Sequence, residues 1–463
     1  MNNDTVTMES NSLKQYLDFY DANRELIDAN SAPALNAVRD QARRALEGAR
    51  LPRKGDEGYE RISLNDMLAP DFGINAGRVN IPVDVAASFR CDVPTLSTSL
   101  GVVVNDLFVP TRAVAEKLPD GVRFMSLRRA AEEMPDLIAP YLELPVDNAM
   151  VQLNQLLLQD GVLLHVAAGV QLQKPLQLVN ILSASIDLMA VRRLLVIVEA
   201  GASAKLLVCD HTQGSDRKYM SLQVVQLHLG RDSQFDLYDL EEASPLTNRY
   251  SALYSTQEAG SRLTVNGSTL SGGMTRNEYS VELSGERSEA TLAGFVVASD
   301  GQTTDNSSVV RHTAERTKSN QLFKYVLDGK SNGAFEGLIV VDEKARFTEA
   351  YQTNRNLLAS SEARMHTRPQ LEIYCDDVKC SHGAATGQLD RNALFYMRTR
   401  GIPEAQAQAM LRQAFMADVI DTVNIEGLRE RLRMLVERRF NGIAASCADC
   451  GSCVSPTNET KNA

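Results

Sequence analysis

A turn-then-strand motif recurs through the middle of the chain and limits the possible folds more than any other feature. Between about residues 150 and 372 helical periodicity is absent, and short alternating runs such as Tyr279–Leu283 take its place. Copies of the motif align on Ser203, Ser233, Ser261, Ser288 and Ala345. The steps are about 27 to 30 residues, if the last interval holds two. A unit of this length cannot bury its own apolar face, so we predict stacked coils, a β-solenoid. A β-sandwich, whose strands also recur regularly, is the alternative.

Helical patterns flank this region. Near the N-terminus, apolar residues from Leu13 to Tyr20 follow the i, i+3, i+4, i+7 spacing of an amphipathic helix. After Asp390, a suitable N-cap, the helical period returns, and Gly401 is placed to end the first helix. The later apolar stripes are too large for about fifty residues to bury alone, so they must pack on the solenoid or on a partner.

We therefore predict an α+β, mainly β protein with four segments. These are a mostly helical N-terminal domain (1–145), a β-helix core (146–388), a C-terminal helical domain (389–441) and a flexible Cys-rich tail (442–463).

Composition excludes several classes of function. The net charge of −11 argues against sequence-independent binding to nucleic acid or to an anionic membrane, both of which need a basic surface. Apolar runs stay well below the ~20 residues that span a bilayer. The N-terminus lacks the basic and apolar regions of a secretory signal, and seven cysteines make a poor disulfide framework. We expect a cytoplasmic protein.

Cys380 and His382 are the main candidate site. They lie two residues apart in a strand-like run, so both side chains share one face while Ser381 points the other way. A thiolate and a neutral imidazole suit iron or sulfur chemistry, but metal sites usually need at least three protein ligands. Either Cys380 is a buried thiol beside a structural histidine, or a second chain completes the site. Cys375, five residues away, falls on the opposite face of a regular strand. We interpret it as buried filler, a residue that only fills space in the core.

The tail carries a second candidate. Cys447, Cys450 and Cys453 have the C-x₂-C-x₂-C spacing of three ligands in ferredoxin-type sites, but the fourth thiol is missing. The tail is either a metal or cluster site or a solvated, oxidation-prone segment. The first reading supports an alternative function, a stand-alone metal-binding or redox protein.

Catalytic motifs are missing from the sequence. Gly329–Ser331 resembles the end of a P-loop, but Lys324 stands where the first glycine belongs, so a solenoid turn is the better interpretation. We expect a protein that is not an enzyme and that takes any ATP-derived energy from another subunit.

The C-terminal third also resembles a known family. The segments Glu372–Tyr374, Lys379–Ala384, Leu394–Tyr396 and Arg400–Ile402 resemble the C-terminal signature of the SufB/SufD family of iron–sulfur cluster assembly scaffold proteins, in its SufD form. Gly337–Asp342 and Glu349–Leu358 look like the same family. The close likeness covers roughly residues 335–440.

The resemblance implies a fold, partners and roles. It implies a right-handed parallel β-helix that pairs with a SufB-like homologue in a SufBCD complex, with Cys380 and His382 handling iron and sulfide at that interface. The iron–sulfur cluster would be transient and shared with the partner. A SufC-like ABC ATPase would dock on the C-terminal helices, and flavin is a further candidate cofactor of the complex. Cys375 departs from the family pattern, where a small residue without a thiol is usual.

Overall fold

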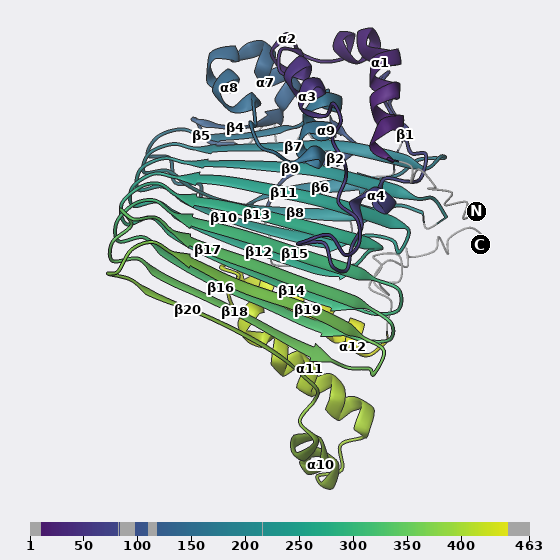
Figure 1. Ribbon diagram of the computed structural model, residues 1–463, viewed down its shortest axis with the longest axis vertical. Helices are drawn as coiled ribbons and strands as arrows, with labels where there is room; N and C mark the ends of the chain where they lie inside the picture. The colour runs from purple at the N-terminus through teal and green to yellow at the C-terminus, as the bar shows by residue number, and fades with distance from the viewer. Residues whose placement is uncertain (1–10, 82, 84–97, 110–117, 215, 443–463) are drawn as a thin grey trace, which may run out of the picture.

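Two parallel β-sheets, wound from one continuous spiral of chain, dominate the structure. The computed structural model describes residues 11–81, 83, 98–109, 118–214 and 216–442. From β5 onward, odd-numbered strands form one sheet, here sheet A, and even-numbered strands form the other, sheet B. Each coil therefore supplies one strand to each sheet, and neighbouring strands pair in parallel (Figure 1). This topology confirms the predicted solenoid and excludes the sandwich.

The strands have the following bounds. Sheet A contains β4 (Val122–Ser126), β5 (Val162–Val166), β7 (Leu188–Val198), β9 (Tyr219–Leu229), β11 (Thr247–Gln257), β13 (Met274–Leu283), β15 (Thr303–His312), β17 (Asn332–Val341) and β19 (Arg364–Ile373), with β1 (Gly73–Ile74) paired to β7. Sheet B contains β2 (Ser99–Val104), β3 (Leu107–Val109), β6 (Leu176–Leu182), β8 (Ser203–Thr212), β10 (Gln234–Glu242), β12 (Arg262–Ser271), β14 (Glu289–Ala298), β16 (Lys318–Leu327), β18 (Glu349–Leu358) and β20 (Lys379–Gly387).

Helices lie at both ends of the spiral. The N-terminal ones are α1 (Leu13–Ala29), α2 (Pro33–Asn36), α3 (Arg39–Ala45), α4 (Leu64–Met67), α7 (Leu127–Glu133), α8 (Pro135–Leu142) and α9 (Ala149–Leu157). The C-terminal ones are α10 (Arg391–Thr399), α11 (Glu404–Ile420) and α12 (Glu426–Phe440). Among the described residues, no helix combines the length and apolar character needed to cross a lipid bilayer.

The passage from sheet A to sheet B uses the same corner in successive coils. A residue with positive φ stands at this corner, and the series is Gly169, Gly201, Asp232, Gly260, Arg287, Arg316 and Phe347. Its backbone N–H donates to a carbonyl of the next coil, as from Phe347 to Asp377 at 2.6 Å. Since positive φ is unfavourable for a bulky residue such as Phe347, the stacked hydrogen bonds must hold it there.

A hydroxyl closes four of these corners and explains the repeat in the sequence. The residue after the corner is buried Ser233, Ser261, Ser288, Thr317 or Thr348. In the last four of these, the hydroxyl donates to the carbonyl three residues earlier, as from Thr348 to Ala345 at 2.8 Å. The predicted alignment is therefore right at its three middle serines. It is one residue late at Ser203, which pairs with Gln234, and three residues early at Ala345. The double interval before Ala345 correctly allows for one more coil, whose corner residue is Thr317.

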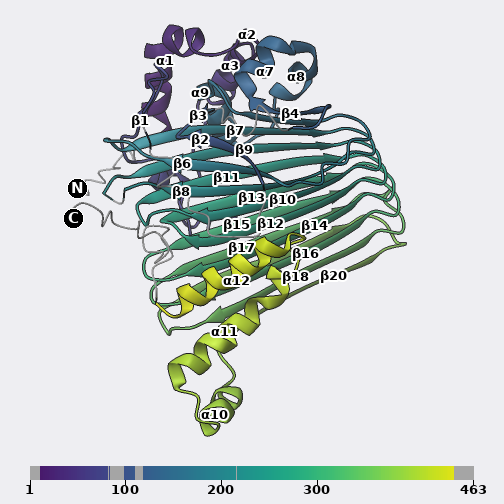
Figure 2. The ribbon, with the colours of Figure 1, turned by 180° about the vertical axis from the view of Figure 1, so that it is seen from behind.

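The interior between the sheets holds one apolar core, which runs from Val166 through Leu237 to Phe323. Two further cores lie outside the solenoid. The N-terminal helices cover the outer face of sheet A, where Tyr16 and Leu195 belong to one buried cluster. Helices α11 and α12 lie across the outer face of sheet B (Figure 2). The C-terminal apolar stripes therefore pack on the solenoid, one of the two predicted solutions.

Candidate functional site

The last coil of the solenoid forms an exposed end. β19 and β20 are the terminal strands of sheets A and B, and within the described residues no further strand pairs with their outer edges. Every residue of β20 is at least partly exposed, in contrast to the buried strands further up the spiral. In Figure 1 β20 lies at the lower margin of the solenoid, with α10 projecting beyond it. The coil therefore offers unpaired backbone groups and half of a core to solvent.

Cys380 faces the interior at this end. It pairs in register with buried Ala350 of β18, and its side chain packs against an apolar cluster of Ile339, Val341, Ala345 and Ala350, here called the end cluster. The strand places the thiol at the mouth of the solenoid, partly covered and partly open.

His382 shares that face, as the two-residue spacing predicts. It pairs with Gln352, a fully buried residue whose amide donates to Gln321 at 3.3 Å inside the solenoid. Because strand residues alternate sides, His382 and Cys380 project in the same direction. His382 is exposed, and no side chain among the described residues hydrogen-bonds to its ring. The imidazole is therefore accessible to any molecule that covers the last coil.

Burial controls the protonation of the thiol. Desolvation raises the pKa of Cys380 above its usual value, a hydrogen bond from the Ala350 backbone opposes the rise, and the nearby Cys375 thiol adds to it. Cys380 is therefore protonated at neutral pH, and it becomes a thiolate when a metal ion or a cation approaches.

Cys375 does not lie where strand alternation put it. The chain turns between β19 and β20, so the opposite-face argument fails, and Cys375 packs on the same end cluster as Cys380. Both thiols are free and partly buried. The predicted position on the opposite face was wrong because parity holds only inside one continuous strand. Packing on an apolar cluster agrees with the filler interpretation, although Cys375 is only partly buried.

A row of polar residues below His382 was not anticipated from the sequence. Gln321 accepts from both Ser308 (2.7 Å) and Gln352, and all three side chains are buried inside the solenoid. The signal was present, since Gln321 and Gln352 occupy equivalent positions of paired strands. It was invisible without the correct coil register.

The remaining candidate ligands do not add to this site. Cys447, Cys450 and Cys453 lie outside the described residues. Within the described residues, no group of three or more His, Cys, Asp or Glu side chains is arranged to hold a metal ion. Cys380 and His382 are thus two candidate ligands, and the described residues place no third one with them.

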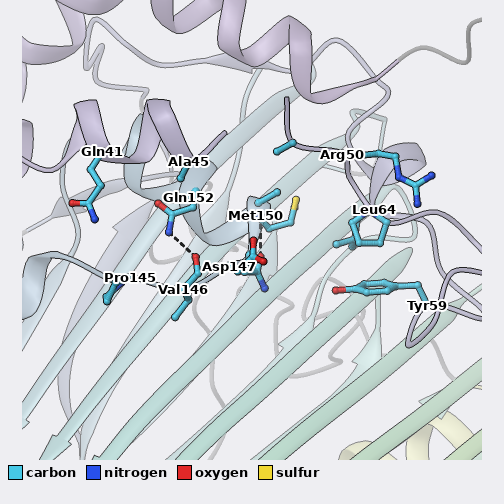
Figure 3. A pocket seen from close by; sticks show the side chains of 14 residues that line it. Gln41, Ala45, Arg50, Tyr59, Leu64, Pro145, Val146, Asp147, Met150 and Gln152 are labelled. Atoms are coloured by element: carbon cyan, nitrogen blue, oxygen red, sulfur yellow. Dashed lines mark hydrogen bonds between the residues drawn. The ribbon is translucent and has the colours of Figure 1, made fainter. Parts of the chain in front are cut away.

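A cavity of about 550 Å³ lies away from these residues, between the N-terminal helices and the outer face of sheet A (Figure 3). Three polar residues of its lining are already bonded within the protein: Tyr59 and Asn148 donate to Glu278, and Gln152 donates to the carbonyl of Val146. None of the described residues that line it carries a thiol or an imidazole. These residues leave a flavin few free hydrogen-bond partners, so we assign the cavity no cofactor.

Helix α10 follows the candidate strand directly and is the most exposed part of the C-terminal region. Asp390 caps it by accepting from the Asn392 backbone, and Gly401 ends it with a φ of 84°, both as predicted. None of its residues is buried, and Phe395 and Tyr396 are 68% and 58% exposed. Two aromatic rings on a projecting helix are typical of a surface that another protein covers.

Comparison with known proteins agrees with this architecture. The family model for the SufBD core domain of the SUF system, which assembles FeS clusters, matches residues 181–415. The model for the SufBD protein N-terminal region matches residues 10–178. Together the two models cover the N-terminal helices, the solenoid and the first C-terminal helix.

Individual relatives align along most of the chain. A SufBD family iron–sulfur cluster assembly protein of Synechocystis is 29% identical over 404 residues, which are 85% of this chain and 88% of that protein. The iron–sulfur cluster assembly protein SufD of Escherichia coli is 26% identical over 397 residues, 85% of this chain and 90% of its own. SufD of Bacillus subtilis is 25% identical over 334 residues, 71% of this chain and 76% of its own.

Proposed function

The chain belongs to the SufB/SufD family of iron–sulfur cluster assembly proteins, and on this premise we propose that it is a SufD-like scaffold subunit whose site is completed by a SufB-like partner. In this role it is not an enzyme. It positions ligands for a cluster that is assembled at the interface between the two subunits and then passed on, so iron and sulfide are its cargo.

The exposed last coil is the observation that carries the proposal. β19 and β20 end both sheets at the same place, and Cys380 and His382 lie on the interior face of β20 at that end. A second solenoid could pair with these edges by strand addition and bury the open core. The same contact would bring further ligands to a pair that is too small to hold a metal alone.

The chemistry of the two residues suits transient binding. Cys380 is a protonated thiol at rest because burial raises its pKa, so iron must displace a proton to bind it. His382 is exposed and can ligate through a neutral nitrogen. Binding therefore depends on the partner's ligands, and release follows when the interface opens.

The C-terminal helices would connect this interface to an ATPase of the SufC type. The exposed rings of Phe395 and Tyr396 on α10 are the docking candidates, and α10 follows β20 after only a short linker. Movement of α10 driven by ATP would therefore pull on the strand that holds Cys380. Alkylation of Cys380 in the assembled complex measures this coupling: its rate should differ between the ATP and ADP states, and equal rates would refute the coupling.

The main test is anaerobic co-expression with SufB-like and SufC-like chains. Wild type is compared with His382→Ala and with Ser381→Ala, which changes the neighbouring residue on the opposite face of β20. Subunit stoichiometry, iron and acid-labile sulfide are measured on the same samples.

We expect all three versions to form the complex, and only His382→Ala to lose iron and sulfide. An isolated chain that holds iron without partners, and loses it when residues 444–463 are deleted, would instead support the stand-alone function of the tail. Flavin stays a prediction for the assembled complex, tested by the absorbance of the purified complex near 450 nm.

A further inference from the structure

Two thiols, rather than one, lie at the mouth of the solenoid. Cys375 belongs to the turn that joins β19 to β20, and Cys380 is the second residue of β20. Both side chains pack against the end cluster. Each is partly exposed, so reagents from solvent reach both sulfurs. In the described residues the remaining cysteine, Cys209, is fully buried on the other side of sheet B.

The turn between the two strands also brings the two residues together. Cys375 is only five residues before Cys380. The turn is held by the ion pair between Arg346 and Asp377 at 2.7 Å and by the hydrogen bond from the Phe347 N–H to the Asp377 carbonyl. The last coil therefore presents two free, partly exposed thiols on one cluster.

We propose that Cys375 and Cys380 form a dithiol–disulfide site, which a low-molecular-weight disulfide such as oxidised glutathione converts to an intramolecular disulfide. This inference rests on the proposed function for its consequence, since the disulfide withdraws Cys380 from iron and sulfide. Its chemistry is independent of that function.

The reaction proceeds as two exchanges. One of the two thiols loses its proton to solvent and attacks one sulfur of glutathione disulfide, forming a mixed disulfide and releasing one glutathione thiolate. The second thiol then loses its proton to solvent and attacks the protein sulfur of the mixed disulfide, releasing the second glutathione. Two protein thiols are oxidised, and one glutathione disulfide is reduced to two thiols.

The consequence is protection of the site when a partner is absent. A lone thiol at an exposed end can be oxidised irreversibly, whereas a disulfide with Cys375 is restored by reductant. Cys380 then returns to the thiol form and regains its place beside His382.

Tryptic mapping tests the proposal on the full-length chain because trypsin cuts after Lys379, between the two thiols. The peptides are Met365–Lys379, in which the Arg368–Pro369 bond resists cleavage, and Cys380–Arg391. The chain is incubated in glutathione redox buffers, free thiols are blocked, and the digest is analysed without reduction. Cys209, which is fully buried, is the internal control for an unreacted thiol.

We expect the two peptides to appear joined by a disulfide that dithiothreitol cleaves. Cys380→Ser should trap glutathione on Cys375 and Cys375→Ser should trap it on Cys380, because each variant lacks the second thiol that completes the exchange. Joining of Cys380–Arg391 to the tail peptide Phe440–Lys461, or glutathione on Cys380 in wild type at the level of Cys375→Ser, would overturn the proposal.

A second readout separates this inference from the proposed function. Under strictly anaerobic conditions Cys375→Ser should support the same iron and sulfide content in the complex as wild type. After exposure to hydrogen peroxide and then to dithiothreitol, wild type should recover more of that content than Cys375→Ser. In wild type the Cys375 thiol converts a Cys380 sulfenic acid to the reducible disulfide with loss of water, whereas in the variant peroxide oxidises the sulfenic acid further to the irreversible sulfinic acid. Equal recovery would refute the protective role, while the anaerobic result would still report on the scaffold function.

Discussion

Lys324 should control how firmly the C-terminal helices are held on the solenoid. Its side chain is only 4% exposed, on the outer face of β16, and its ammonium group donates to the Phe415 carbonyl at 2.7 Å. It also pairs with Asp418 at 2.6 Å and lies 4.6 Å from the centre of the Phe415 ring. These contacts join α11 to sheet B at one point.

Lys324→Met keeps the packed stem and removes the charge. The charged hydrogen bond is worth about 1.5–3 kcal/mol, the half-exposed Asp418 pair at most about 1 kcal/mol, and the cation–π contact about 0.5–1 kcal/mol. The variant regains the cost of burying the ammonium group, which offsets part of this sum. We expect a net loss of about 2 kcal/mol in the free energy that holds α11 on sheet B.

Hydrogen–deuterium exchange measures that local free energy. A loss of about 2 kcal/mol corresponds to roughly 30-fold faster exchange of amides in α11, because 1.4 kcal/mol is a factor of ten. Amides in β11 and β13, which are distant from this contact, should not change. The control is Lys330→Met, since Lys330 is 72% exposed and only 3.8 Å from an exposed Glu362. Exchange in α11 that differs less than threefold between the two variants would refute the reasoning.

Two further predictions concern the solenoid itself. His312 is fully buried with both ring nitrogens bonded to hydroxyls, and burial lowers its pKa to about 4. As pH falls, the unfolded chain therefore binds a proton on His312 before the folded chain does, and the free energy of unfolding should fall by about 3 kcal/mol between pH 6.5 and pH 4. Urea unfolding at several pH values should show that this free energy depends less on pH in His312→Gln than in wild type. The same pH dependence in both proteins would contradict this prediction. Phe323→Ala should cost about 3–5 kcal/mol in the same assay, since its ring packs 4.7 Å from that of Phe335 inside the solenoid; a loss below 1 kcal/mol would show that the coil collapses around the gap.

The architecture was largely predictable because the signal is periodic. Ser233, Ser261 and Ser288 mark successive corners, and at Ser261 and Ser288 the hydroxyl closes the turn. The alignment was wrong where the residue type changes. Threonine replaces serine at Thr317 and Thr348, so the first of these corners was allowed for only as an interval and the second was placed three residues early, at Ala345.

The candidate site was predictable only in part. Alternation along one strand correctly placed Cys380 and His382 on a single face, since both belong to β20. The same rule misplaced Cys375, because a corner lies between it and Cys380 and carries the chain from one sheet to the other. The polar row of Gln321 and Gln352 was missed because it joins residues of different coils.

Features that repeat or are local could be predicted from the amino-acid order alone: coils of about 30 residues, the caps of α10, and two candidate ligands on one strand face. These follow from backbone geometry and side-chain spacing, which act over a few residues. Three other features emerged from the folded chain: the site lies at an exposed end, Cys375 joins Cys380 on one cluster, and α11 and α12 cover sheet B. Such features depend on which coil is last and on how distant segments pack, and no local pattern encodes either.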